Sequence, residues 1–125
     1  LMRIPLRAIA FALTTVIAAS ACTAEEVARY LDSTEAVRDV LSAQDLARLR
    51  DCESTDNYQA ISPSGVYRGA YQFDQTTWDD VAGRFFPWLV GLDPVDVEPW
   101  WQDAMARALW SERGKQPWPI CGHEV

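Results

Sequence analysis

The sequence contains a single histidine, His123, which lies two residues from the C-terminal end. A Ser/His/Asp triad would have to use this residue, which argues against that kind of nucleophilic site. Histidine and cysteine are too scarce to suggest a metal cluster, and no glycine-rich phosphate-binding loop occurs. Internal repeats and low-complexity tracts are also missing. We therefore expect neither a metal site nor a cofactor.

Charge is absent from a stretch near the N-terminal end. Arg3 and Arg7 precede a run over residues 8–19 that has no charged side chain, and the first acid is Glu25. The run is shorter than the roughly 20 apolar residues that span a bilayer. A basic start, a short apolar run and small residues at its end are typical of a secretory signal. We predict a signal peptide over residues 1–21, with a buried N-terminal helix as the alternative.

The rest of the chain is acidic and well supplied with aromatic side chains. The sequence has 18 acidic and 11 basic residues, and loss of residues 1–21 removes two basic ones, so the net charge changes from −7 to −9. Such a surface argues against nucleic acid and anionic lipid as partners. A sugar polymer would be held instead by hydrogen bonds and by the faces of six Trp, four Tyr and four Phe. The length of 125 residues suggests one domain, and we expect a monomer.

Three cysteines, Cys22, Cys52 and Cys121, leave one thiol over in an exported chain. Cys22 follows Ala19-Ser20-Ala21, where a lipoprotein signal places its acylated cysteine, although ordinary cleavage after Ala21 also fits. Acylation would make a lipid anchor the only contact with a membrane and would leave Cys52 to pair with Cys121. That bridge would close a loop of about 70 residues and add roughly 4 kcal/mol in the chain-entropy model.

Helices are predicted before the second cysteine. Residues 23–51 contain no Gly or Pro, and apolar side chains recur at helical spacing. Ser42 followed by Asp45 resembles a capping box, so a new helix is expected to begin near Ala43 and to run to about Cys52.

The chain is therefore divided into three parts. Residues 1–21 are the predicted signal peptide and residues 22–42 are interpreted as a helical spacer. Residues 43–123 are expected to form the functional domain. The sequence leaves open whether residues 23–41 are a separate spacer or an extra layer on that domain.

Residues 58–73 are predicted to form a β-hairpin, with the turn at Pro63-Ser64-Gly65. Gly69 interrupts the second strand, which often marks a bulge or the close approach of a ligand. Strand alternation predicts two opposite faces, one with Tyr67, Tyr71 and Phe73 and the other with Val66, Arg68, Ala70 and Gln72.

Two further helices are predicted after the hairpin. Asp74 is expected to cap a helix that ends at Gly83, with Phe73 and Trp78 packed as a hydrophobic staple. A last helix runs from near Pro99 to Gly114, and residues 117–121 are expected to form an extended strap over the core. We therefore predict an α+β fold that is mainly helical with one β-hairpin. The apolar stripe of the last helix consists of Trp101, Ala104, Met105, Ala108 and Leu109.

Glu53 is the residue whose position most suggests chemistry. It follows a cysteine at a predicted helix end, directly before a loop. A carboxyl in that position can be partly desolvated, which raises its pKa and allows it to act as an acid near neutral pH. An ordinary solvated Glu is the alternative.

Several motifs in fixed order resemble the resuscitation-promoting factor family, also called the transglycosylase-like family, of the lysozyme-like superfamily. The run Cys52-Glu53-Ser54-Thr55-Asp56-Asn57-Tyr58 resembles its CESGGNW opening. Residues 65–73 resemble its hairpin motif, and residues 74–78 resemble its next helix start. Residues 102–109 and 114–121 resemble its last helix and its Trp-Pro-x-Cys end. Residues 84–98, including Trp88, match these motifs poorly and would form either a groove wall or ordinary core.

The resemblance implies a small lysozyme-like domain with a Cys52–Cys121 disulfide. It implies secretion and cleavage of the bond between N-acetylmuramic acid and N-acetylglucosamine in peptidoglycan, with another cell-wall hydrolase as a further possible partner. The catalytic glutamate of the family falls on Glu53. Its substrate-groove residues fall on Asp74, Thr77 and Gln102, with Tyr67 and Gln72 as neighbours.

The sequence departs from the family where Thr55 and Asp56 replace two glycines. The loop is expected to be stiffer and more acidic, and a nearby Asp56 would raise the pKa of Glu53 by like-charge repulsion. Most glycosidases use two catalytic carboxylates. If Glu53 is the first, Asp56 and Asp74 are the candidates for the second. We favour a mechanism in which Glu53 is the only acid and the N-acetyl group of the substrate assists.

Two other kinds of function stay open at this stage. A glycan-binding or signalling module could keep this fold with little turnover, although a pure lectin has no need of an acid at Glu53. A structural lipoprotein could bind another envelope protein through residues 23–41 or through residues 85–88. The sequence does not distinguish hydrolysis from transfer to the sugar's own 6-hydroxyl.

Overall fold

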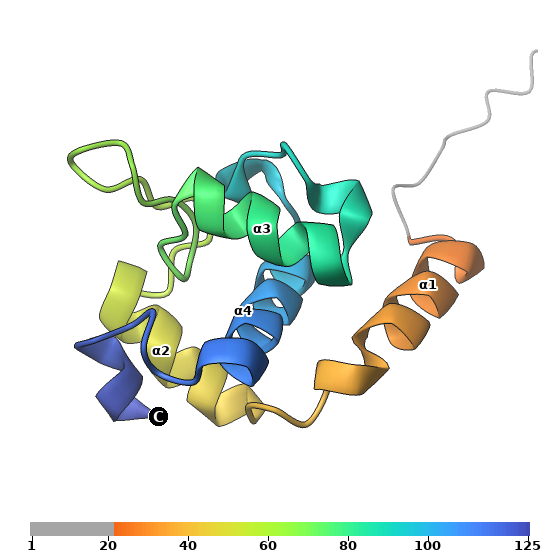
Figure 1. Cartoon of the computed structure of the whole chain (residues 1–125), viewed down its shortest axis with the longest axis horizontal. Coiled ribbons are helices and arrows are strands. Elements are labelled where there is room, and N and C mark those ends of the chain that lie inside the picture. Colours follow the sequence, from red (N-terminus) through yellow and green to blue (C-terminus); the bar gives the residue numbers. More distant parts are fainter. Residues whose placement is uncertain (1–21) are drawn as a thin grey trace, which may run out of the picture.

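The computed structural model describes residues 22–125, so the predicted signal peptide lies outside the described residues (Figure 1). None of the helices in this part of the chain has both the length and the apolar character to cross a membrane. The α-helices are α1 (Ala24–Thr34), α2 (Ala43–Ser54), α3 (Gln75–Phe85) and α4 (Pro99–Arg113). Short 3-10 helices are η1 (Glu35–Val37), η2 (Pro87–Leu89), η3 (Pro94–Asp96) and η4 (Cys121–Glu124).

The predicted capping box starts α2. The Ser42 side chain accepts a hydrogen bond from the Asp45 N–H, and the Asp45 carboxylate accepts one from the Ser42 N–H, both at 3.0 Å. These bonds satisfy amide groups that have no partner within a helix. The predicted start at Ala43 is confirmed, and the helix continues past Cys52 to Ser54.

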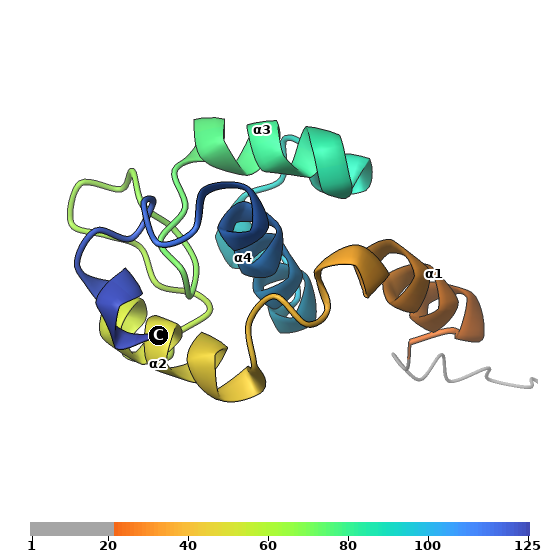
Figure 2. The same cartoon turned by 60° about the horizontal axis from the view of Figure 1, so that its bottom comes forward.

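The segment before α2 packs on the rest of the domain. Val37 and Leu41 are buried in the common core, and the Tyr30 ring contacts the Trp101 ring with centroids 5.1 Å apart. Most of α1 itself is exposed, including Val27 and Leu31. Both views place α1 on the opposite side of α4 from α2 (Figures 1 and 2).

Helix α4 supplies the centre of the core, as its apolar stripe predicts. Ala104, Met105, Ala108 and Leu109 are buried, and Gly114 ends the helix with a positive φ of 58°. The expected staple before α3 is present as well, since the rings of Phe73 and Trp78 meet edge to face. These local signals therefore predicted the start of α3 and both ends of α4 correctly.

Helix α3 does not end at Gly83, because the following turn still closes. Phe86 is fully buried, and its N–H donates to the Ala82 carbonyl at 2.8 Å. The helix therefore extends to Phe85. Burial of an aromatic side chain beyond the glycine outweighs the small helix penalty of glycine itself.

The predicted β-hairpin over residues 58–73 is wrong. The described residues contain no β-strand, and only isolated bridges join Ile61 to Arg68 and Arg68 to Phe73. Gly69 and Gln72 both have positive φ and lie in one tight turn, across which Arg68 and Phe73 exchange backbone hydrogen bonds. This turn breaks the alternation of a continuous strand. The predicted division of these residues between two opposite strand faces is therefore also wrong. Ala70 and Tyr71 are adjacent and both are buried, whereas Tyr67 is exposed. The fold is therefore a small helical domain rather than α+β.

Gly69 allows a close approach, but the approaching group belongs to the chain. A Cβ atom at this position would lie 2.6 Å from the Gln102 Oε1 atom and 3.3 Å from the Pro94 Cβ atom. The sequence favoured a bulge or a ligand at this glycine, and the structure places a buried side chain there.

Replacement of Gly69 by Ala is expected to lower the free energy of unfolding by about 2–3 kcal/mol, because it strains a positive φ and displaces the Gln102 amide. Gly65 is the matched control, since its φ is also positive and its added Cβ would meet nothing within 4 Å. Urea unfolding should show a clearly smaller loss for Gly65→Ala. Equal losses would show that the contact with Gln102 does not matter.

The C-terminal segment returns to α2 through the predicted disulfide. Cys52 and Cys121 are bonded, and Cys22 is free and exposed. The chain before Cys121 turns instead of forming an extended strap, and η4 follows it. The Trp118 side chain is buried, so its ring fills the core and its indole N–H needs an acceptor, which the Tyr71 carbonyl provides at 3.0 Å. Both views show η4 beside α2 (Figure 2).

Candidate functional site

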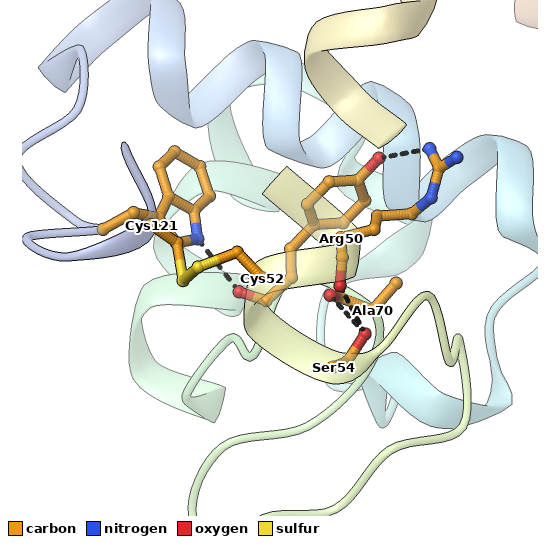
Figure 3. The surroundings of a disulfide bond; sticks show 7 residues. Arg50, Cys52, Ser54, Ala70 and Cys121 are labelled. Atoms are coloured by element: carbon orange, nitrogen blue, oxygen red, sulfur yellow. Dashed lines mark hydrogen bonds between the residues drawn. A yellow bond between two sulfur atoms is a disulfide. The ribbon is translucent and has the colours of Figure 1, made fainter. Parts of the chain in front are cut away.

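Glu53 lies in the last turn of α2 between two anchored residues. Cys52 is bonded to Cys121, and the Ser54 hydroxyl donates to the Ala70 carbonyl at 2.9 Å (Figure 3). The helix end is thus tied to the C-terminal segment on one side and to the loop over residues 58–73 on the other. The backbone that carries Glu53 is held by covalent and hydrogen-bonded contacts from two distant parts of the chain.

The Glu53 carboxyl is half-buried, and this burial raises its pKa above the ordinary value. Burial acts in this direction because it disfavours the charged carboxylate. The prediction that Asp56 raises this pKa is wrong. Asp56 is instead paired with Arg50, whose Nε atom lies 2.7 Å from the Asp56 carboxylate.

The two positions where the family carries glycine have a left-handed backbone here. Thr55 and Asp56 have φ values of 56° and 57°. This conformation is unusual for a β-branched residue and more tolerable for Asp. The Thr55 N–H closes α2 by donating to the Asp51 carbonyl at 3.0 Å. The turn directly after Glu53 therefore keeps the shape that glycine would favour, with strain at Thr55.

A pocket of about 290 Å³ brings four of the predicted groove residues together. Tyr67, Gln72, Asp74 and Thr77 line it from the loop and from the start of α3. The opposite wall comes from the end of α4 and the segment after it, with Leu109, Arg113, Gln116, Pro117 and Trp118. Glu53 is not among the lining residues. Glu53 is connected to this wall through its neighbour Cys52, whose partner Cys121 lies three residues after Trp118.

The carboxylate of this pocket is that of Asp74. Its carboxylate caps α3 by accepting from the Thr77 N–H and also accepts from the Thr77 hydroxyl, both at 2.8 Å. The Gln72 amide donates to the Gly69 carbonyl at 3.0 Å, which supports the left-handed backbone at Gln72. Within residues 22–125, the Gln72 amide oxygen and the Tyr67 hydroxyl have no hydrogen-bond partner. Such neutral polar groups can hydrogen-bond to hydroxyl or amide groups of a ligand, while the two ionisable side chains of the lining, Asp74 and Arg113, are already bonded to Thr77 and Asp80.

Gln102 does not reach this pocket. Only 2% of the residue is exposed, and its amide oxygen accepts from the Ala70 N–H at 2.9 Å. Its amide nitrogen donates to the carbonyls of Tyr58 and Val97, both at 3.0 Å. The prediction that its amide extends into the groove is therefore wrong. Gln102 instead holds three backbone segments together behind the loop.

Sequence reasoning missed a polar cluster beside α2. One oxygen of the Asp103 carboxylate accepts from the hydroxyls of Tyr71 at 2.6 Å and Tyr58 at 2.8 Å, and Arg50 lies 3.3 Å from it. Arg50 also donates to the Tyr71 hydroxyl (Figure 3). Burial, reinforced by Asp103, raises the pKa of both tyrosines. The cluster joins α2, the loop and α4. The only feature of the sequence that could have indicated it is a single acid, Asp103, beside the apolar stripe of α4.

Residues 22–125 contain no group of three or more His, Cys, Asp or Glu side chains placed to hold a metal ion. The acids nearest Glu53 in sequence are engaged elsewhere or exposed: Asp56 pairs with Arg50, and Asp51 is exposed. The chemistry available at the end of α2 is therefore that of a single half-buried carboxyl.

A family model and two curated relatives that match this chain are all described as transglycosylases or transglycosylase-like. The family model described as transglycosylase-like domain matches residues 41–121. "Probable transglycosylase SceD 3" of Staphylococcus saprophyticus is 36% identical over 66 residues, which cover 53% of this chain and 26% of that protein. "Probable transglycosylase SceD" of Staphylococcus aureus is 34% identical over 73 residues, which cover 58% of this chain and 30% of that protein. The chain thus spans less than a third of these relatives. No solved structure matches it.

Proposed function

The chain belongs to the transglycosylase-like domain family, and we propose that it cleaves the glycan strand of bacterial peptidoglycan with Glu53 as the general acid. The target is the bond between N-acetylmuramic acid and N-acetylglucosamine. The observation that carries the proposal is the Glu53 carboxyl itself, which is half-buried, has a raised pKa and is fixed at the end of α2. A raised pKa increases the share of the carboxyl that is protonated and can donate a proton to a leaving oxygen.

In the proposed reaction, Glu53 protonates the glycosidic oxygen while the bond from the anomeric carbon to that oxygen breaks. The N-acetyl group of the same sugar stabilises the anomeric carbon. Glu53, now a carboxylate, then takes a proton from the incoming nucleophile. This nucleophile is water in a hydrolase and the sugar's own 6-hydroxyl in a transglycosylase.

Two observations support a mechanism with one acid. Asp56 is neutralised by Arg50, and both oxygens of Asp74 accept hydrogen bonds from Thr77. Neither carboxylate is free in the way a second catalytic group requires. The names of the relatives favour transfer to the 6-hydroxyl, which gives an anhydro sugar.

The substrate would contact the pocket lined by Tyr67, Gln72, Asp74 and Thr77. Gln102 takes part through the backbone that it supports, because it is buried. Export through a signal peptide over residues 1–21 and the domain limits 43–123 are also part of the proposal. Acylation of Cys22 and ordinary cleavage after Ala21 are the two alternatives for the processing of the signal. Membership of the resuscitation-promoting factor group within the family stays a prediction.

The test is to incubate the purified chain from Cys22 onward with isolated peptidoglycan and to determine the masses of the soluble muropeptides. We expect fragments whose reducing end is lighter by one water than the hydrolysis product. Fragments of the full mass would show hydrolysis by the same site. Binding to the wall without release of fragments would contradict the enzyme and leave a glycan-binding module.

A further inference from the structure

A second pocket, of about 440 Å³, lies between α1 and the start of α4. We call it the α1 pocket, and its volume falls within the range of small-molecule sites, about 300–1,000 Å³. Because α1 and α2 lie on opposite sides of α4, it is remote from Glu53 (Figures 1 and 2). It is lined by Cys22, Glu26, Val27, Arg29, Tyr30, Trp88, Glu98, Trp100 and Trp101.

The tryptophans of the α1 pocket differ in hydrogen bonding from Trp78 and Trp118, the two that are buried in the core. The indole N–H groups of Trp78 and Trp118 donate to backbone carbonyls. Those of Trp88, Trp100 and Trp101 have no partner within residues 22–125, and Trp88 and Trp100 are each 41% exposed. Trp110, which packs against the core, also lacks a partner for its N–H among the described residues, so an unpaired N–H alone marks no site. What distinguishes Trp88, Trp100 and Trp101 is that all three line one pocket, where they offer donors and aromatic surface together.

The aromatic walls are held in place by contacts with each other. The Trp101 ring contacts the rings of Trp88 at 5.3 Å, Phe86 at 5.4 Å and Tyr30 at 5.1 Å between centroids. The Arg29 guanidinium lies over the Trp88 ring, 5.9 Å from its centroid. A pocket built in advance loses less free energy in ordering its side chains when it binds.

Two carboxylates determine what the α1 pocket accepts. Glu98 makes no side-chain hydrogen bond or ion pair with the described residues, and one oxygen of Glu26 accepts from the Thr23 N–H at 2.7 Å. The two carboxylates outnumber the one cation of the lining, Arg29, whose guanidinium lies over the Trp88 ring, so the pocket disfavours an anion. Covering the carboxylates with an apolar helix would be costly because their charges would lose water. They accept hydrogen bonds well from hydroxyl groups.

We propose that the α1 pocket binds a neutral N-acetylated sugar unit of a glycan strand. The apolar face of the sugar ring would lie against the tryptophans, its hydroxyls would donate to Glu26 and Glu98, and its carbonyl would accept from an indole N–H. The inference rests on the proposed function for its choice of glycan. It gives the chain a second contact with the wall, separate from the place of cleavage.

The test uses the Glu53→Gln form, which the proposed mechanism predicts cannot cut glycan, and the tetramer of N-acetylglucosamine as the probe. NMR resolves the indole N–H signals, and the tetramer should shift those of Trp88, Trp100 and Trp101. Trp100→Ala in this background should weaken binding of the tetramer at the α1 pocket roughly tenfold, for the loss of one aromatic wall. Ile120→Ala, an exposed apolar residue that lines neither pocket, is the matched control and should have no effect.

Shifts confined to residues around Thr77, or no shifts at all, would overturn the proposal. Changes that depend on protein concentration and occur without sugar would assign the pocket to a second copy of the chain and would also overturn it. Cleavage is measured separately with the unaltered chain. If the indole signals shift but the unaltered chain does not cut peptidoglycan, the proposal of sugar binding at the α1 pocket is supported and the proposed function is contradicted.

Discussion

Exchange of Glu53 for Gln is expected to slow the release of muropeptides from peptidoglycan by roughly 10²–10⁴-fold, the usual contribution of a positioned acid or base. Gln has nearly the same shape but carries no proton that it can give to a leaving oxygen. Its neutral amide also resembles the protonated carboxyl that burial favours at this position. The rate should therefore fall while the fold and the binding of glycan are retained.

Asp51→Asn is the matched control for this substitution. Asp51 is an exposed carboxylate on the same helix, two residues away, and its side chain makes no hydrogen bond with the described residues. Initial rates of muropeptide release should be unchanged in this variant. A similar fall in both variants would point to the charge of α2 rather than to the acid, and an unchanged rate in Glu53→Gln would remove Glu53 from the mechanism.

Removal of the disulfide by the double exchange of Cys52 and Cys121 for Ala is expected to lower the free energy of unfolding by about 4 kcal/mol. The bond joins residues 69 positions apart, so the reduced unfolded chain gains much conformational freedom. The bond also holds the turn of α2 that carries Glu53. We therefore expect cleavage to be lost at temperatures where the native chain is still active.

Cys22→Ser is the control for this double variant, because it removes a cysteine side chain without removing a disulfide. Cys22 is free and exposed, and its replacement should leave unfolding by urea unchanged. A loss below about 1 kcal/mol in the double variant would show that other contacts hold the C-terminal segment. The buried Trp118 side chain, whose N–H donates to the Tyr71 carbonyl, would then be the main anchor.

The features that the sequence predicted well depend on neighbours along the chain. The start of α2 needs only Ser42 and Asp45, and the start of α3 needs only Asp74 and the pair Phe73 and Trp78. The buried stripe of α4 follows from its helical period. Each of these signals lies within one or two helical turns, so its structure could be predicted without knowledge of the remainder of the fold.

The loop over residues 58–73 could not be predicted in this way, because distant groups determine its shape. The side chains of Ser54 and Trp118 donate hydrogen bonds to the carbonyls of Ala70 and Tyr71, respectively. The Gln102 amide oxygen accepts one from the Ala70 N–H. These contacts bury two adjacent residues, which no strand alternation allows. The pattern of alternating residues was real, but tertiary hydrogen bonds to Ala70 and Tyr71 outweighed it.

The site was predicted unevenly for the same reason. Tyr67, Gln72, Asp74 and Thr77 lie close together in sequence and line one pocket, as the motifs suggested. Gln102 lies on a helix face beside the apolar stripe, and its position there does not tell whether the amide points into the core or into a groove. The wall from Arg113 to Trp118 was not predicted, although the disulfide that returns the chain to this place was, because turns replace the expected extended strap before Cys121.

The most direct test of the role of Glu53 compares the titration of its carboxyl, followed by NMR, with the pH dependence of kcat/KM on a soluble glycan fragment. Burial should place the pKa of Glu53 above the ordinary value of about 4.3 for Glu. Because the protonated form is the acid, kcat/KM should fall as the pH rises through that same pKa. Agreement between the two is the result that we predict. A Glu53 that titrates normally, with activity that persists far above its pKa, would contradict its assignment as the acid.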